Sequence, residues 1–167
     1  MSLLVSPNIL VLSIRAEYAK KIFDGRKKVE LRRIRPRHLQ EGDLVIVYLP
    51  SPEKALVGVF EVERIVQEHP NKLWNMVKGK AGLSYKEFKI YYEDASVGFG
   101  IFLKNTSSFC QPVKLARLRE EWSDFRPPQC YRYVKPSEID LVETITQCNI
   151  VNISERQKSY QMTLEIS

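Results

Sequence analysis

Short apolar segments recur along the chain, and they limit its fold more than any other feature of the sequence. Each segment has the length of a β-strand, and several alternate apolar with polar side chains, which is typical of strands with one buried face. Residues that favour turns, such as Gly42 and Pro50, stand between several of them. We predict strands at residues 8–14, 27–34, 44–49, 55–66, 96–103 and 111–115.

Helical patterns occupy several of the intervals between these strands. Apolar residues spaced three and four apart predict helices at residues 15–24, 69–78, 84–94 and 119–124, and a last turn that starts at 136 and ends near 146. Ser13 is expected to cap the first helix. Ser84 and Glu87 have the spacing of a capping box, in which each side chain binds the backbone N–H of the other residue.

These elements predict an α+β protein built on a small β-barrel. We expect five to six mostly antiparallel strands with three to four peripheral helices. A chain of 167 residues has the size of one domain, which we place at residues 1–146. The tail at 147–167 is expected either to add an edge strand, through residues 162–166, or to be partly disordered.

Several classes of protein are disfavoured by the composition. The sequence holds no apolar run of about 18 residues, so we expect no membrane span. Cys110, Cys130 and Cys148 are spaced neither as zinc ligands nor as an even disulfide framework, which indicates a cytoplasmic protein with reduced thiols. His38 and His69 are isolated in the sequence, so we expect no metal site and no cofactor.

Positive charge is concentrated in one early segment. Residues 11–40 contain ten Lys or Arg and three Asp or Glu, a net charge of +7, whereas the whole chain carries +6. Such a cluster is typical of a surface that binds phosphates, and it is also compatible with an ordinary solvated surface. Both interpretations are open at this point.

Within that segment, Gly25, Lys27, Glu30 and Arg32 form the pattern G-x-K-x-x-E-x-R. A carboxylate between two cations stays ionised and can accept a hydrogen bond from a base amine or from an attacking water. The planar guanidinium of Arg32 suits a phosphate or a base edge, and Lys27 supplies a point charge. The alternative is a structural ion pair of Glu30 with Arg32 or Lys28.

This pattern resembles the signature of the ASCH domain, a family of the PUA-like barrel superfamily. The resemblance covers about residues 8–135 and includes the first strand and helix, Gly42-Asp43 and Val57-Gly58. It implies a PUA-like barrel with a cleft between barrel and helices, lined by the signature residues. It also implies that the protein binds RNA or a modified nucleotide.

The same resemblance raises the question of catalysis. Some small ASCH members are amidohydrolases that act on acetylated cytidine, and others have been described as ribonucleases. The amidohydrolases carry a threonine nucleophile where this chain has Glu30, a lysine that corresponds to Lys27, and a downstream acid near Ala81. The nucleophile and the acid are not matched, so we lean against an enzyme. If the protein is a hydrolase, Lys27 and Glu30 are the catalytic candidates, with Glu30 as general base.

The candidate site residues form three groups. Those expected to line the cleft and contact RNA are Ser13, Arg15, Lys27, Glu30 and Arg32. Those expected to follow the phosphates are Lys28, Arg33, Arg35 and Arg37. Those expected to stack on unpaired bases, unless they form a packed lid, are Gln129, Tyr131, Arg132 and Tyr133.

Gly98 and Gly100 occupy alternate positions of a predicted strand, which indicates close approach of a helix or a base. The sequence thus predicts an RNA- or modified-nucleotide-binding protein, with a role in regulating transcription or translation. The alternatives are a hydrolase of RNA or a modified nucleoside, and an adaptor that binds a protein through its tail.

Overall fold

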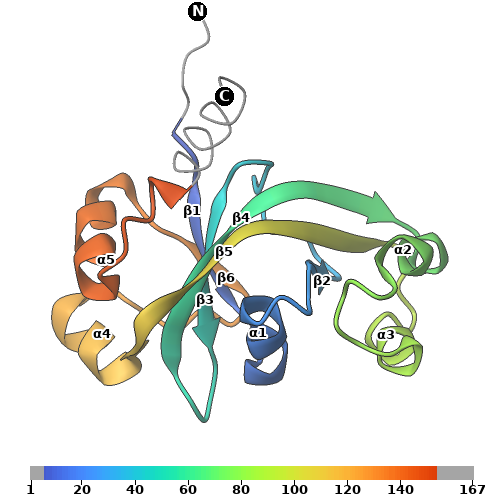
Figure 1. Cartoon of the computed structure of the whole chain (residues 1–167), viewed down its shortest axis with the longest axis horizontal. Helices are drawn as coiled ribbons and strands as arrows, with labels where there is room; N and C mark the ends of the chain where they lie inside the picture. The colour runs from blue at the N-terminus through green and yellow to red at the C-terminus, as the bar shows by residue number, and fades with distance from the viewer. Residues whose placement is uncertain (1–5, 154–167) are drawn as a thin grey trace, which may run out of the picture.

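A curled, mixed sheet forms the centre of the computed structural model, which describes residues 6–153 (Figure 1). Its strand order is β2-β5-β4-β3-β1-β6. Within the described residues β1 pairs with β3 in parallel, and the other neighbouring strands are antiparallel. The strands are β1 (Ile9–Ser13), β2 (Val29–Arg32), β3 (Leu44–Leu49), β4 (Ala55–Glu68), β5 (Gly98–Lys114) and β6 (Tyr131–Tyr133). The expected α+β fold with a barrel-like sheet is confirmed.

The helices lie at both ends of this sheet and beside its middle (Figure 1). Helices α4 and α5 are at one end, α2 and α3 are at the other, and α1 lies between them. They are α1 (Ala16–Phe23), α2 (Pro70–Val77), α3 (Tyr85–Tyr91), α4 (Leu115–Glu121) and α5 (Ile139–Thr146), with a 3-10 turn at Pro136–Glu138 before α5. Within the described part of the chain no helix is long and apolar enough to cross a membrane.

Strand β5 differs from the prediction, which divided it into two strands at 96–103 and 111–115. The structure has one strand of 17 residues. The residues between the two predicted segments are mostly polar and exposed, but they still pair with β4 through several register shifts. The predicted helix at 119–124 begins earlier, at Leu115, because Leu115 and Leu118 are buried on its inner face.

The expected capping role of Ser13 is wrong. Helix α1 begins after Arg15, which caps it without a side-chain hydrogen bond. Ser13 is still the last residue of β1, too early in the chain to reach the first turn of the helix, and its hydroxyl donates to the carbonyl of Pro128 at 2.6 Å. The capping box of Ser84 and Glu87 is confirmed.

Two glycine features explain how neighbouring elements pack. A Cβ atom on Gly98 would lie 2.7 Å from the ring of Tyr92 and 2.8 Å from Leu73, so this glycine allows the α2 and α3 layer to approach the sheet. Gly100 faces Leu73 in the same layer. Of the two interpretations given above, close packing of helices is the one the structure shows. Gly42 has a φ of +89° in the turn before β3, a conformation that favours glycine.

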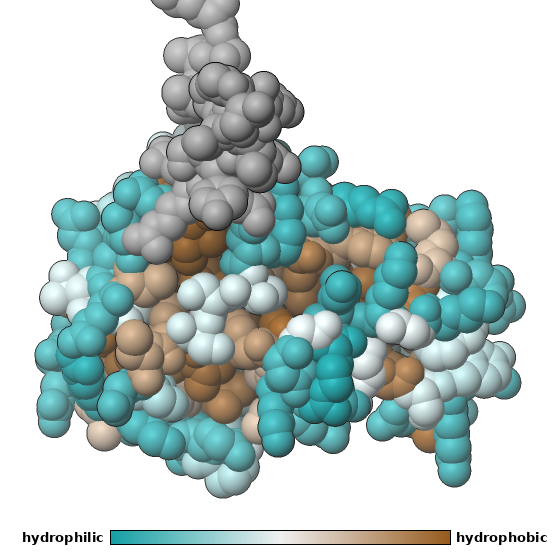
Figure 2. Space-filling view, in the orientation of Figure 1, coloured by the Kyte–Doolittle hydropathy of each residue, from teal (hydrophilic) through white to brown (hydrophobic). Residues whose placement is uncertain are grey.

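Side chains of three hydrophobic clusters fill the space between these layers. One contains Trp122 and Phe125 beside α4 and α5, a second contains Ile22 and Phe60 beneath α1, and a third contains Phe88 beside α2 and α3. Figure 2 shows hydrophobic residues near the middle of the viewed face, between α4–α5 and α1, with mostly hydrophilic residues around the outside. The sheet is therefore anchored from both ends, which holds the residues at its centre in fixed positions.

Candidate nucleic-acid interface

A cleft of about 710 Å³ opens where the ends of β1, β2 and β3 meet. Its floor includes Glu30 and Arg32 from β2. One wall comes from Tyr18 of α1 and Tyr91 of α3, and the facing wall comes from Tyr48 and the segment 127–129. This volume is within the range of small-ligand sites and is large enough for a nucleotide.

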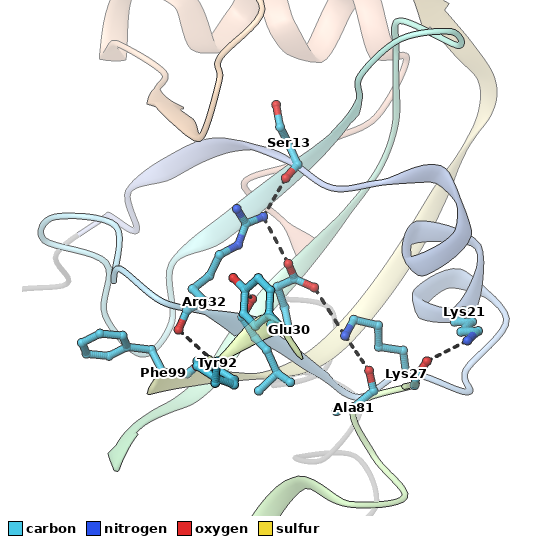
Figure 3. A network of polar contacts seen from close by, with 11 residues as sticks. Ser13, Lys21, Lys27, Glu30, Arg32, Ala81, Tyr92 and Phe99 are labelled. Carbon is cyan, nitrogen blue, oxygen red and sulfur yellow. Dashed lines mark hydrogen bonds and ion pairs between the residues drawn. The ribbon is translucent and has the colours of Figure 1, made fainter. Parts of the chain in front are cut away.

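Glu30 is the centre of a line of polar contacts on the floor (Figure 3). Its Oε1 lies 3.1 Å from Nη2 of Arg32, and its Oε2 lies 3.5 Å from Nζ of Lys27. The side chain of Glu30 is only 9% exposed, so water screens these ion pairs weakly. Its two oxygens hold about four lone-pair sites, so it can accept further hydrogen bonds from a ligand.

Arg32 joins the floor to the end of β1. Its Nη2 donates to the carbonyl oxygen of Ser13 at 2.6 Å, and the hydroxyl of Ser13 in turn binds Pro128 in the facing wall. The Nε of Arg32 is buried and has no hydrogen-bond partner among the described residues. A buried N–H without a partner lowers the stability of the fold. A small shift of the Arg32 side chain would let this N–H donate to an acceptor atom of a ligand.

Lys27 lies behind Glu30 and does not line the cleft. Its side chain is 2% exposed, and its Nζ donates to the carbonyl oxygen of Ala81 at 2.6 Å. Burial lowers the pKa of Lys27, and the nearby carboxylate of Glu30 opposes that shift. Lys27 therefore supports Glu30 from inside the protein rather than meeting a ligand.

Two tyrosines of the α3 end fix β2 in place. The hydroxyl of Tyr92 donates to the carbonyl of Arg32 at 3.1 Å, and the hydroxyl of Tyr91 donates to that of Leu31 at 3.3 Å. Burial raises the pKa of both tyrosines, so both stay protonated donors at neutral pH. The floor of the cleft is thus held by side chains that themselves have fixed partners.

Three exposed cations stand around the cleft on separate elements: Arg15 before α1, Lys54 in the turn between β3 and β4, and Arg119 on α4. Within residues 6–153 none of the three forms an ion pair or a side-chain hydrogen bond, so their charges are available to a ligand. Only Arg15 was among the candidates from the sequence. Lys54 and Arg119 lie outside the basic segment, in a part of the chain without excess positive charge, so the charge count gave no signal for them.

The structure divides the residues that were expected to stack on bases. Gln129 lines the cleft. Tyr131 and Tyr133 pack beside the cluster beneath α1 and bind the backbone of Arg37, whose N–H donates to Tyr131 Oη at 3.2 Å and whose carbonyl accepts from Tyr133 Oη. Both rings therefore have the geometry of the packed lid, the alternative to base stacking.

Arg132 is also used inside the protein. Its guanidinium lies 4.5 Å from the ring of Trp122, and its Nη2 lies 2.9 Å from Oε2 of Glu138. Glu138 also accepts hydrogen bonds from the indole N–H of Trp122 and from the backbone N–H of Lys135. This group holds β6 against the end of α4, away from the cleft lining, because the side chain points to the opposite side of the strand from Tyr131 and Tyr133.

The residues expected to follow phosphates do not line the cleft. Lys28 is exposed, and its backbone N–H binds the carbonyl of Lys80. Arg33, Arg35 and Arg37 are exposed on the loop that follows β2. Arg33 approaches the cleft, since its Nη1 lies 3.4 Å from the carbonyl of Tyr91. These four cations are therefore exposed surface residues outside the lining, and Arg33 contacts a residue of the cleft wall. Among the described residues no group of three or more His, Cys, Asp or Glu side chains could hold a metal ion.

Comparison with known proteins identifies the same family as the G-x-K-x-x-E-x-R pattern that contains Glu30 and Arg32. The family model of the ASCH domain matches residues 12–150. The chain belongs to the ASCH domain family. This ASCH protein is 30% identical over 136 residues to an ASCH domain-containing ribonuclease of Zymomonas mobilis. The aligned region covers 81% of this chain and 90% of the relative.

Solved structures show the same fold. A crystal structure of ASCH from Zymomonas mobilis has a TM-score of 0.75 and 29% sequence identity, covering 81% of this ASCH protein and 94% of that chain. The N-terminal domain of Thermococcus gammatolerans McrB, solved bound to m5C DNA, has a TM-score of 0.54 and 12% sequence identity. The match covers 84% of this ASCH protein and 97% of that chain. At that identity the second comparison concerns the fold alone.

Proposed function

We propose that this ASCH protein binds RNA, or a modified nucleotide within RNA, in the cleft above Glu30 and Arg32. The observation that carries the proposal is the arrangement of charge. Arg15, Lys54 and Arg119 surround the opening without an ion pair or side-chain hydrogen bond to any described residue, and the ion-paired carboxylate lies at the floor. Cations placed around a cleft suit the phosphates of a bound strand, while a polar floor can contact the base.

Glu30 gives the cleft a means of selecting a base. An ionised carboxylate only accepts hydrogen bonds, so it prefers a base edge that carries an amino group, such as cytosine or adenine. Uracil presents carbonyl oxygens in the corresponding region, which a carboxylate repels. The flanking Lys27 and Arg32 keep Glu30 in one orientation, which makes the selection geometric as well as electrostatic.

The test is a set of fluorescence anisotropy titrations with short single-stranded RNAs of adenine, cytosine or uracil. We expect the adenine or cytosine strand to bind about tenfold more tightly than the uracil strand, since a hydrogen bond to a charged group contributes about 1.5–3 kcal/mol. Glu30→Gln should lose this preference while it still binds. Equal affinity for the three strands in the unchanged protein would overturn the role of Glu30 as a base reader.

Hydrolysis of RNA is a second candidate function. It is favoured by the Zymomonas mobilis relative, which is named a ribonuclease and matches over 90% of its length. If the protein hydrolyses RNA, Glu30 is the general base that takes a proton from the attacking water. Incubation with end-labelled RNA would yield shorter products that disappear in Glu30→Gln. A binding protein instead retains intact RNA during the same incubation.

The cellular role follows from the same proposal. Binding of RNA by a small protein supports a role in regulating transcription or translation, and we place that role in the cytoplasm. The support for this compartment is the pair of exposed thiols at Cys110 and Cys130, which are typical of a reducing environment.

A further inference from the structure

An isoleucine projects into solvent from the loop that follows β2, next to Arg33, which contacts the cleft wall residue Tyr91. Ile34 is 80% exposed, compared with 64% for Ile90, 51% for Tyr85 and 39% for Tyr91, the other large hydrophobic residues exposed in the described chain. Ile34 follows the floor residue Arg32 by two positions. Because extended chain spans at most about 3.6 Å per residue, the Cα atoms of Ile34 and Arg32 lie within roughly 8 Å of each other.

The loop that carries Ile34 is braced from behind. The guanidinium of Arg35 donates through Nε to the carbonyl of Leu39 at 3.1 Å, and Leu39 is fully buried. The backbone of Arg37 is bound on both sides by the hydroxyls of Tyr131 and Tyr133. These contacts tie the residues that follow Ile34 to the body of the protein, and Ile34 itself stays exposed.

Cations flank this exposed side chain. Arg33 precedes it and Arg35 follows it, with Arg37 beyond the buried Pro36. An apolar side chain between arginines has the composition of the wedges that proteins insert between stacked bases, in which the cations hold the phosphates on either side. A protein partner is disfavoured, because the apolar surface is a single side chain and the charged residues that flank it in the loop are all positive.

We propose that Ile34 is a wedge that takes the stacking position beside the nucleotide bound in the cleft, so that the protein opens a base step at a paired end of RNA. The side chains of Arg33 and Arg37 hold the phosphates of the opened step, while Arg35 keeps the loop in place. This inference rests on the proposed function, because a wedge has a task only where the cleft binds RNA. It assigns a substrate class, RNA with a stacked or paired segment next to the bound nucleotide.

The test uses a short RNA hairpin with 2-aminopurine at the end of its stem, together with an unpaired strand of the same bases. Fluorescence of 2-aminopurine rises when its neighbour is unstacked, and anisotropy reports binding. We expect the fluorescence to rise when the unchanged protein binds the hairpin. Ile34→Ser should bind the unpaired strand normally, bind the hairpin about tenfold more weakly and produce no rise, since part of the burial energy of an isoleucine is lost.

Two further variants make the result specific. Ile90→Ser removes an isoleucine of similar exposure on α3 and should behave as the unchanged protein. Ile34→Phe keeps an apolar wedge and should retain the fluorescence rise. An equal rise with Ile34→Ser, or binding of the hairpin by the unchanged protein without any rise, would overturn the wedge and leave the proposed function standing. Absence of binding to both RNAs would overturn the proposed function and the wedge together.

Discussion

Replacement of Glu30 with alanine is expected to lower the free energy of unfolding by about 3 kcal/mol, because breaking a buried pair from one side leaves an uncompensated charge. The charge is that of Lys27, whose side chain is 2% exposed and lies 3.5 Å from the carboxylate. Arg32 also loses its ion pair with Glu30, although it keeps its hydrogen bond to the carbonyl oxygen of Ser13. Urea unfolding followed by circular dichroism measures the change.

Two controls separate the buried charge from the loss of a side chain. Glu63→Ala removes an exposed carboxylate from β4 and should change the free energy of unfolding by less than about 0.5 kcal/mol. The double variant Lys27→Met/Glu30→Leu replaces the pair with apolar groups of similar volume and should recover most of the loss. If Glu30→Ala were as stable as Glu63→Ala, the floor of the cleft would not be the buried ion pair described here.

The free energy of unfolding of the Glu30→Ala variant should also rise with pH in the alkaline range. Burial lowers the pKa of Lys27 from its usual value of 10.5, so between the folded and the unfolded pKa the unfolded chain binds more protons. The free energy of unfolding therefore rises with pH in that window. Without the carboxylate the pKa of Lys27 falls further and the window extends to lower pH, so Glu30→Ala should regain stability as the pH rises, and the double variant should not.

Replacement of Glu138 with alanine should also cost about 3 kcal/mol of unfolding free energy, since the partly buried Arg132 loses its ion pair and the indole N–H of Trp122 loses its acceptor. Glu138 is 8% exposed and accepts hydrogen bonds from Arg132, Trp122 and Lys135. Arg132 already has one buried nitrogen, Nη1, without a hydrogen-bond partner among the described residues. For a chain of this size the expected loss corresponds to a fall in Tm of roughly 9 °C.

The matched control for Glu138 is Glu120→Ala, which removes an exposed carboxylate from α4 and should leave Tm nearly unchanged. Because Arg132 holds β6, the Glu138 variant should also loosen the segment 127–129 in the cleft wall. Faster amide hydrogen exchange in β6 would show this. A normal Tm for Glu138→Ala would mean that the contacts of Arg132 do not hold this end of the sheet.

Much of the sheet and part of the site could be predicted from the sequence because the relevant residues are close together in it. The G-x-K-x-x-E-x-R pattern places Lys27, Glu30 and Arg32 on one short segment, and the structure brings all three into one line of contacts. The capping box of Ser84 is equally local. The split of β5 failed because exposed polar residues can still pair with a neighbouring strand, which depends on β4 rather than on local pattern.

The remaining part of the site depends on contacts between distant segments. Lys54 and Arg119 meet at the cleft only because the turn before β4 and the helix after β5 lie side by side, as the bond from the N–H of Leu115 to the carbonyl of Lys54 shows. Arg132 looked suited to RNA because its sequence neighbours are aromatic. Its partner, Glu138, is separated from it by Pro136, and nothing local indicates that the two side chains meet.

The most direct test of the central claim is a titration of pooled cellular RNA at about 50 mM and about 200 mM salt, because contacts to phosphates weaken steeply between these concentrations. The proteins compared are the unchanged chain, Glu30→Gln/Arg32→Ala, and Asp24→Asn/Arg26→Ala, which makes the same change of charge at an exposed ion pair. Circular dichroism first verifies that each variant is folded. We predict salt-dependent binding that falls roughly 30-fold in the cleft variant, from the loss of charged hydrogen bonds, and is unchanged in the control. Equal binding by the two variants would contradict the account, since RNA would then bind the basic surface without using the cleft.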